Sequence, residues 1–458
     1  MRIRTLSTPE LGNRSYVVDD GTTSVVIDPQ RDLDRLDDLL EHGVSHVLET
    51  HVHNDYVTGG LELARRTGAE YGVNADDAVE FERSPLTDGQ ELRAGSLSVA
   101  VLATPGHTPT HLSYLVRDLA EPGAAPAVFS GGSLLYGTVG RTDLVSADLT
   151  RKLAAAQYAS AHRLAGLPEA AALFPTHGFG SFCAGGGASG ADASTIADER
   201  AKNLALTAES LEEFVETLLE SFTAYPSYYA HMAPLNRAGP APLDLSAPLR
   251  PAEATTILRL LADGATVVDL RPAAEFATAH LAGSLSVSLG AQFATYVGWL
   301  APWGRPMAVI GAHREQLEDA RRQLARIGVE ELSPAWGSLA ELAPTADVRS
   351  YRRASFDDLA AEAAADDVVV DVRRDDEFDA DHVRGALNIP LHELDARSPG
   401  LPRDRRVWVY CAGGFRAGTA ASLLDGHDLD VVHVDDGFDR AVELGLTGVE
   451  RSWRRPTP

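Results

Sequence analysis

Two histidines and an aspartate alternate near the start of the chain, in the order His51-Val52-His53-Asn54-Asp55. The stretch follows an apolar run and precedes a Gly-Gly pair and a helix-like segment, 61–66. Side chains two residues apart on an extended chain point the same way, so His51 and His53 can bind one ion. The spacing therefore predicts a metal site where a strand ends.

A second reactive group is predicted at Cys411, which follows the apolar run 407–410 and opens the segment Cys411-Ala412-Gly413-Gly414-Phe415-Arg416. Glycines let backbone N–H groups turn inward around the sulfur, and the helix expected over 417–424 adds positive potential at its start. We expect Cys411 to be a thiolate and a catalytic residue, with Gly413 and Gly414 binding the substrate. Arg416 is the second predicted catalytic residue, because its planar fork suits an anionic oxygen.

The other cysteine, Cys183, lies six residues after His177. A sulfur relay near the metal and a buried thiol are both compatible with this position. We therefore leave Cys183 out of the predicted catalytic set.

Four strand-like runs position the polar groups of residues 1 to 190. They end in the metal stretch, in a loop that contains His107, in the loop Ser130-Gly131-Gly132-Ser133, and in a loop that contains His177. Polar loops that gather at one edge of a layered sheet are what a metal or substrate site requires.

An internal repeat follows. Asp269, Arg271, Glu275, Phe276, His280 and Gly283 recur as Asp371, Arg373, Glu377, Phe378, His382 and Gly385, each 102 residues later. A duplicated α/β unit explains this spacing, and we include Arg373 among the predicted substrate-binding residues. In the first copy the equivalent of the cysteine loop is Gly311-Ala312-His313-Arg314, so that copy is expected to be a spacer or docking surface.

The region 191–250 connects these parts. A helix is expected over 212–222, and the proline-rich segment from Tyr225 to Pro242 is expected to be an extended arm. Its aromatic residues are expected to pack against a neighbouring domain or subunit.

Composition limits the possible partners. The chain has 458 residues, 66 Asp and Glu against 40 Lys and Arg, and a formal net charge of -26, which argues against nucleic acid and anionic membranes as partners. No run approaches the ~20 apolar residues of a membrane helix and no apolar signal stretch opens the chain, so we expect a cytoplasmic protein. Two distant cysteines favour a reactive thiol over a disulfide framework.

Four segments together resemble the metallo-β-lactamase fold, in its persulfide dioxygenase and glyoxalase II branch. They are 50–60, Thr104-Pro105-Gly106-His107-Thr108, the loop leading to Gly140-Arg141-Thr142-Asp143, and Pro175-Thr176-His177-Gly178. The resemblance covers about residues 1 to 190 and implies an αββα sandwich. It also implies the metal ligands His51, His53, His107, Asp55 and His177.

Two residues depart from that family. Tyr56 stands where many members have a second-site histidine, and Gly132 stands where the family usually has a metal-binding aspartate. A two-metal hydrolase needs both ions fully ligated, so these losses make a second site unfavourable. We expect one metal ion, held chiefly by His51, His53 and His107, and favour Fe(II) over Zn. Substituting Gly132→Asp is expected to restore a ligand.

The repeat resembles the rhodanese fold, which implies an α/β multidomain chain. Its predicted parts are the metallo-β-lactamase domain (1–190), a connecting helix and arm (191–250), a rhodanese-like domain without the cysteine (251–345) and a rhodanese domain with Cys411 (352–458).

This order resembles bacterial enzymes that fuse a persulfide dioxygenase to a sulfurtransferase. That resemblance implies oxidation of a small thiol persulfide to sulfite at the metal, and sulfur transfer through Cys411 that gives thiosulfate. Two alternatives stay open: a thioester hydrolase fused to a sulfurtransferase, and a sulfur carrier in which only Cys411 reacts. We also expect a homo-oligomer.

Overall fold

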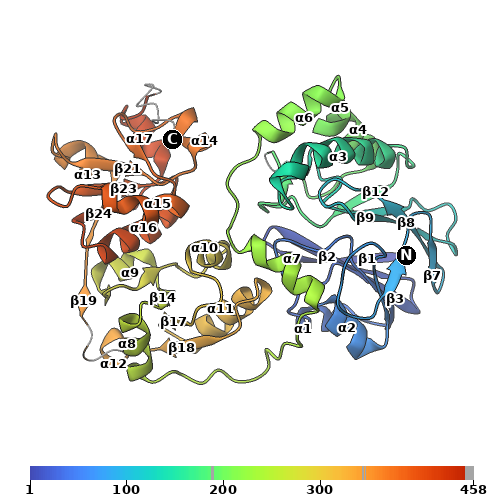
Figure 1. Ribbon diagram of the computed structural model, residues 1–458, viewed down its shortest axis with the longest axis horizontal. Helices are drawn as coiled ribbons and strands as arrows, with labels where there is room; N and C mark the ends of the chain where they lie inside the picture. The colour runs from blue at the N-terminus through green and yellow to red at the C-terminus, as the bar shows by residue number, and fades with distance from the viewer. Residues whose placement is uncertain (187–189, 343–344, 346, 449–458) are drawn as a thin grey trace. The chain divides into compact units, whose positions relative to one another are not determined.

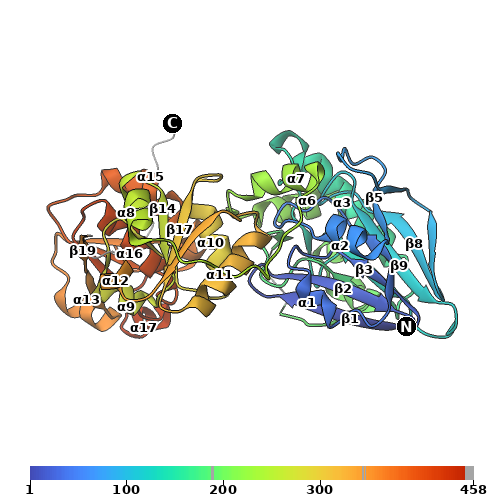
Figure 2. The same ribbon diagram turned by 90° about the horizontal axis from the view of Figure 1, so that it is seen from below.

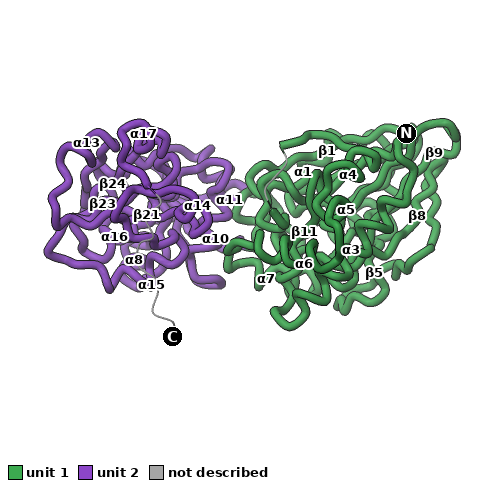
Figure 3. Tube along the Cα trace, turned by 90° about the horizontal axis from the view of Figure 1, so that it is seen from above, with its two compact units in different colours: residues 1–247, 322–328 green, residues 248–321, 329–458 purple. Residues whose placement is uncertain are grey.

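The computed structural model describes residues 1–186, 190–342, 345 and 347–448. The chain divides into two compact units (Figure 3). Unit 1 comprises Met1–Ala247 and Arg322–Gly328, and unit 2 comprises Pro248–Arg321 and Val329–Pro458. The predicted last domain ends at 458, so its final part, 449–458, lies outside the described residues. No helix in the described ranges is long and apolar enough to cross a membrane.

Unit 1 is built on two sheets (Figure 1). The six-stranded sheet has the order β1 (Arg2–Thr8), β2 (Asn13–Asp19), β3 (Thr23–Ile27), β4 (Gly43–Leu48), β5 (Glu70–Asn74), β6 (Ser84–Leu86). The five-stranded sheet has the order β12 (Ala172–Pro175), β10 (Ala127–Gly131), β9 (Leu112–Asp118), β8 (Leu97–Ala103), β7 (Glu91–Ala94). A short pair, β11 (Val139–Gly140) and β13 (Ala184–Gly185), completes the strands.

Alternation along the strands explains the layers of unit 1. Val18, Val25 and Ile27 face a core that lies between the two sheets. Their neighbours Val17 and Val26 face the opposite side, where they join a core with helix residues. Because both faces of these strands are covered, their sequence is a continuous apolar run.

Helices cover the outer faces of the two sheets (Figures 1 and 2). The six-stranded sheet is covered by α1 (Asp34–Asp37) and α2 (Gly60–Thr67). The five-stranded sheet is covered by α3 (Thr150–Ala165), α4 (Ile196–Lys202), α5 (Leu204–Thr207) and α6 (Leu211–Glu220), with a 3₁₀ turn, η1 (Ala147–Leu149), before α3. The result is the expected αββα sandwich.

The expectation of an extended arm is wrong for its central part. Helix α7 (Tyr229–Ala238) occupies that segment and belongs to unit 1. Tyr229, Met232, Ala233 and Asn236 lie at helical spacing and are buried. Packing of this face outweighs the helix-breaking tendency of Pro234, which lies inside the helix.

Unit 2 holds two parallel sheets with equivalent strand orders. The first copy has the order β16 (Leu285–Ser286), β14 (Thr266–Asp269), β17 (Met307–Gly311), β18 (Leu332–Trp336). The second has β22 (Leu387–Asn388), β21 (Val368–Asp371), β23 (Val407–Tyr410), β24 (Val431–Val434), with β20 (Arg352–Ala354) added at its edge. The equal order is what a duplicated α/β unit predicts.

The remaining elements of unit 2 connect these strands. The first copy contains α8 (Ala254–Ala262), α9 (Ala273–Thr278), α10 (Phe293–Leu300), the first part of α11 (Arg314–Arg326), whose end from Arg322 belongs to unit 1, and α12 (Leu339–Leu342). The second contains α13 (Phe356–Glu362), α14 (Asp375–Ala380), η2 (Leu391–Glu393), α15 (Leu394–Arg397), η3 (Ser398–Gly400), α16 (Phe415–Gly426) and α17 (Phe438–Glu443). A small pair joins β15 (His280–Leu281), inside the first copy, to β19 (Val348–Arg349), which follows that copy.

Candidate metal centre and cysteine loop

Three buried histidines meet at the ends of β4, β8 and β12. His51, His107 and His177 each offer one ligand atom, and these atoms lie within 4.8 Å of one another. The Nε2 atoms of His51 and His177 are 3.2 Å apart. All three are among the predicted ligands, and the expectation that His51, His53 and His107 are the chief ligands stays a prediction.

His53 and Asp55 form a second triad that shares His177. Three atoms around these triads, His53 Nδ1, His107 Nε2 and Asp55 Oδ1, are buried and have no hydrogen-bond partner in the described part of the chain. Buried polar atoms are rarely left unpaired, because their desolvation is costly. Nitrogen and carboxylate oxygen are the donors that Fe and Zn take in proteins, so the residues present fit a metal ion.

The other ring nitrogen of each histidine is held by the protein. His51 Nδ1 lies 2.9 Å from the Thr50 hydroxyl, and His107 Nδ1 lies 2.7 Å from the Arg141 carbonyl oxygen. His177 Nδ1 lies 3.0 Å from Asn13 Oδ1. Such contacts are typical of metal-binding histidines, because they fix the tautomer and the ring orientation.

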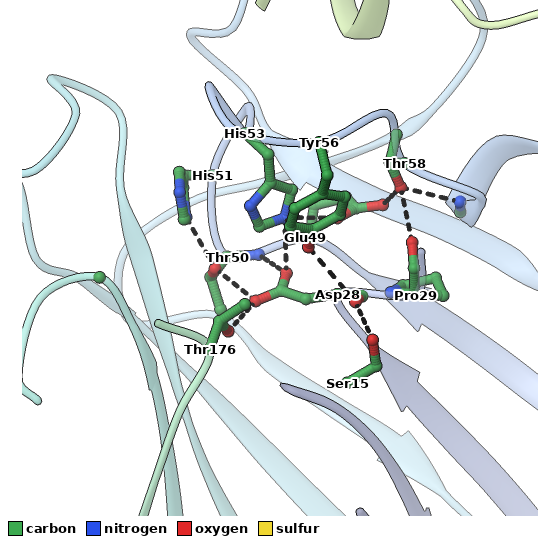
Figure 4. Close-up of polar contacts among 12 residues, drawn as sticks. Ser15, Asp28, Pro29, Glu49, Thr50, His51, His53, Tyr56, Thr58 and Thr176 are labelled. Atoms are coloured by element: carbon green, nitrogen blue, oxygen red, sulfur yellow. Dashed lines mark hydrogen bonds and ion pairs between the residues drawn. The ribbon is translucent and has the colours of Figure 1, made fainter. Parts of the chain in front are cut away.

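His53 is held from the outside by two acids (Figure 4). Its Nε2 lies 3.1 Å from Glu49 Oε2 and 3.3 Å from Asp28 Oδ1. Asp28 also accepts hydrogen bonds from Thr50 and Thr176, so it ties the ends of β4 and β12 together. With Nε2 engaged, only Nδ1 of His53 remains for an ion.

His177 is shared by the two triads. Its Nδ1 faces Asn13 Oδ1 and, at 3.2 Å, Asp55 Oδ2, so Nε2 is its one available donor. A ring nitrogen has a single lone pair and binds a single ion. The two triads therefore depend on the same side chain.

Burial sets the charge of the ligands. Burial, followed by neighbouring histidines, lowers the pKa of His51 well below its ordinary value. Burial and His177 lower the pKa of His107 to about 3. Burial opposes ionisation of Asp55, but His177 and His53 lower the pKa of that carboxyl. Two neutral imidazoles and a carboxylate are ready to bind a metal without losing a proton.

Tyr56 and Gly132, the two residues that depart from the family pattern, both lie next to the candidate metal ligands. The Tyr56 hydroxyl lies 2.9 Å from His53 Nε2, and its ring stacks on His53, so Tyr56 supports that histidine from outside. A Cβ at Gly132 would lie 2.3 Å from His107 Cδ2. The His107 ring therefore occupies the space next to Gly132.

Four supporting residues were not predicted: Asn13, Asp28, Glu49 and Asn236. Asn236 on α7 donates to the carbonyl oxygens of His53 and Tyr56 at 3.0 and 2.9 Å. Asn13 donates to Asp55 at 2.8 Å. An acid directly after an apolar strand, as at Asp28, is a signal that sequence reasoning could have used; an isolated asparagine carries none.

Cys411 follows β23 directly and is 2% exposed. Gly414 has a φ of 87° and precedes α16, so a side chain there would be strained. The backbone N–H groups of residues 412–416 have no acceptor among the residues that the structure describes. The loop thus offers unpaired donors beside the thiol, and substrate binding by Gly413 and Gly414 stays a prediction.

Arg416 makes a contact that was not predicted. Its guanidinium binds both carboxylate oxygens of Glu377, at 2.6 and 2.7 Å. The fork expected to bind an anionic substrate is therefore engaged by α14. We assign Arg416 a positioning role for the loop, and its direct contact with substrate stays a prediction.

Arg373 is also held by the protein. It binds both oxygens of Asp371, at 2.7 and 3.0 Å, and its guanidinium lies 3.8 Å from the ring centre of Phe438. In the first copy Arg271 binds both oxygens of Asp269 in the same way. The copy without a cysteine keeps the Asp-x-Arg pair, so the pair supports the fold. Substrate binding by Arg373 stays a prediction.

Cys183 is fully buried in unit 1, and burial, together with Asp55, raises the pKa of its thiol well above the ordinary value. A neutral thiol is a poor nucleophile. The decision to leave Cys183 out of the catalytic set agrees with this environment.

Comparison with known families identifies the class of both parts. Residues 8–177 match the family model of the metallo-beta-lactamase superfamily, and residues 355–443 match that of the rhodanese-like domain. The chain therefore carries a metallo-beta-lactamase fold at its N-terminus followed by a rhodanese-like domain, as predicted.

The individual proteins to which the chain is similar are identical to it at about a quarter to a third of the aligned positions. A metallo-beta-lactamase structure from Staphylococcus aureus subsp. aureus COL is 24% identical, with a TM-score of 0.65 over 74% of this chain and 99% of that chain. ETHE1 from Myxococcus xanthus is 30% identical, with a TM-score of 0.44 over 52% of this chain and 99% of that chain. A hydroxyacylglutathione hydrolase from Acidiphilium cryptum is 36% identical over 112 residues, which are 24% of this chain and 46% of the relative.

Proposed function

We propose that this chain oxidises a low-molecular-weight persulfide with dioxygen and transfers sulfane sulfur through Cys411. The first reaction is RSSH + O2 + H2O → RSH + H2SO3, in which the outer sulfur is oxidised and dioxygen is reduced. In the second, the persulfide form of Cys411 gives its outer sulfur to sulfite, which leaves the cysteine thiolate and thiosulfate.

The observation that carries the proposal is a donor set for a single ion. His177 has one available nitrogen, Gly132 has no side chain, and the Tyr56 hydroxyl is turned to His53. Hydrolysis by two metals needs both ions ligated around a shared hydroxide. A single centre is the arrangement that favours oxidation over two-metal hydrolysis.

The residues of the centre have separate tasks. His51, His107 and His177 would hold the ion, and His53 and Asp55 would complete its surroundings. A redox-active ion held there would supply the activation of dioxygen and the binding of a thiolate sulfur. Asn13 and the Arg141 carbonyl fix the rings of His177 and His107, so that their Nε2 atoms stay directed at one point.

A second candidate is thioester hydrolysis at the same centre, since the Acidiphilium relative is named a hydroxyacylglutathione hydrolase. We also propose that the first copy in unit 2 is a rhodanese-like domain that has lost its nucleophile. The predicted small-molecule partners, cytoplasmic location and homo-oligomeric state stay predictions.

Loading purified protein with Fe(II) or Zn(II) separates the candidates. We expect glutathione persulfide to cause oxygen uptake and sulfite release by the Fe(II) form, and we expect His177→Ala to lose both. Cleavage of S-lactoylglutathione without oxygen uptake would select the hydrolase instead. Sulfur transfer in a protein that retains no metal would select the carrier.

A further inference from the structure

The first copy in unit 2 has a cavity beside the loop that corresponds to the cysteine loop of the second copy. An open cavity of about 390 Å³ lies among Leu270, Ser288 and Gln316 of this copy and Gly414, Phe415 and Asp435 of the second. Leu270 follows β14, Ser288 follows β16 and Gln316 follows β17. The cavity thus lies at the carboxyl ends of parallel strands, where α/β sheets bind ligands, and its volume is within the ~300–1,000 Å³ of small-molecule sites.

Its lining has lost the charges that the second copy has at equivalent positions. Pro272, Ala273 and Ala274 line the cavity, and the repeat aligns them with Arg374, Asp375 and Asp376. Gln316 stands where the second copy has Arg416, and its Oε1 accepts from the N–H groups of Ala312 and His313. The lining therefore offers no cation to a free inorganic anion. The N–H groups of Ala312 and His313, in the loop that corresponds to the cysteine loop, are already hydrogen-bonded.

The one acid in the lining is Asp435. Its Oδ2 lies 2.8 Å from Arg353 Nε, so its charge is balanced. The cavity suits an organic group that is apolar with a few amide-like polar groups.

The cavity borders the cysteine loop. Gly414 and Phe415 belong to both the lining and the loop that begins at Cys411. The Phe415 ring packs edge-on against Tyr296 of α10, with centroids 5.5 Å apart. An organic molecule held in the cavity is therefore close to the loop that carries the reactive sulfur.

We propose that this cavity binds the organic part of a low-molecular-weight thiol that accepts sulfur from Cys411. The inference rests on the proposed sulfur transfer. The thiol RSH, as its thiolate, attacks the outer sulfur of the Cys411 persulfide; an RS–S bond forms, the Cys411 S–S bond breaks, and the electron pair leaves on the Cys411 thiolate. The products are RSSH and Cys411, with no change in total oxidation state.

Filling the cavity tests the assignment. The substitution is Ala274→Trp on α9, and the matched control is Ala361→Trp on the exposed face of α13. Sulfur transfer from thiosulfate is measured to cyanide, which is too small to need the cavity, and to glutathione. We expect Ala274→Trp to raise the KM for glutathione by about tenfold and to leave both cyanide constants unchanged, and we expect Ala361→Trp to change neither.

Each other result has a definite meaning. An unchanged KM for glutathione in Ala274→Trp overturns the assignment. An equal loss with both acceptors also overturns it, because the cavity would then only support the loop. Absence of transfer to cyanide in the unmodified protein refutes the proposed sulfur transfer itself.

Binding of S-methylglutathione, measured by calorimetry, supplies a readout that does not depend on turnover. Binding to the unmodified protein that is lost in Ala274→Trp supports the cavity. Equal binding to both proteins, or none to either, overturns it.

Discussion

Replacing Gly132 with Ala would test the centre by adding one methyl group. The Cβ would lie 2.3 Å from His107 Cδ2, whereas ordinary contacts begin at 3.4 Å. The ring would have to move by about 1 Å, but metal sites tolerate only about ±0.2 Å in ligand distance. Gly132 does not have a positive φ, so alanine adds no backbone strain there.

The His107 ring has little freedom to move away. Its Nδ1 is bound to the Arg141 carbonyl, its backbone N–H donates to Gln157, and Gly140 lies against it on another side. We therefore expect Gly132→Ala to weaken metal binding by about 10- to 100-fold, the range seen when support of a metal ligand is disturbed. This corresponds to about 1.4–2.8 kcal/mol.

Chelator competition with Fe(II) or Zn(II) measures the change, and metal content after dialysis provides a second reading. Gly43→Ala is the matched control, because its Cβ would meet no atom within 4 Å. Unchanged affinity in Gly132→Ala would refute the role of the His107 position. The same overlap applies to Gly132→Asp, so the expectation that this substitution restores a ligand is replaced by an expected loss of affinity.

Three further predictions concern the ligands and the cysteine loop. His177→Ala should lose bound metal, because His177 belongs to both triads, whereas the exposed His162→Ala should retain it in elemental analysis. Cys411→Ser should abolish transfer from thiosulfate to cyanide with metal content unchanged, and Cys183→Ser should keep transfer; the reverse pattern would place the reactive thiol in unit 1. Burial opposes ionisation of Glu377, but the ion pair with Arg416 lowers the pKa of its carboxyl. The pair therefore stabilises the fold fully above the unfolded pKa of ~4.3, and this stabilisation is lost as pH falls through the lower folded pKa. Thermal unfolding from pH 6 to 3 should therefore show a larger loss in the unmodified protein than in Glu377→Gln, and equal losses would contradict the pair.

The sequence was a good guide to the strands that carry the ligands. The four apolar runs around Val47, Val99, Val128 and Leu173 became β4, β8, β10 and β12. These strands are buried on both faces, so their composition alone distinguishes them from the loops that follow. The candidate ligands could be proposed from the sequence because each stands in such a loop.

The choice among ligands needed the fold. His51 and His53 have equivalent spacing in sequence, yet His53 Nε2 is held by Glu49 and Asp28 while His51 Nε2 faces His177. Glu49 lies four residues before His53 after the same strand, whereas Asp28 reaches His53 from the end of β3, a contact that no local pattern reports. Helix α7 was missed for a similar reason, since Pro234 favours an extended chain locally and packing against unit 1 decides otherwise.

The duplication in unit 2 separates residues that maintain the fold from residues that serve chemistry. Both copies keep the Asp-x-Arg pair and the strand order, so these features are needed wherever the sheet forms. Only the second copy has the thiol and the Arg416–Glu377 pair; the first has Gly311 and Gln316 at the corresponding positions. The first copy has no cysteine at this position but still lines a cavity beside the loop of Cys411. Under the proposed sulfur transfer, its retention is explained if it holds the molecule with which Cys411 reacts.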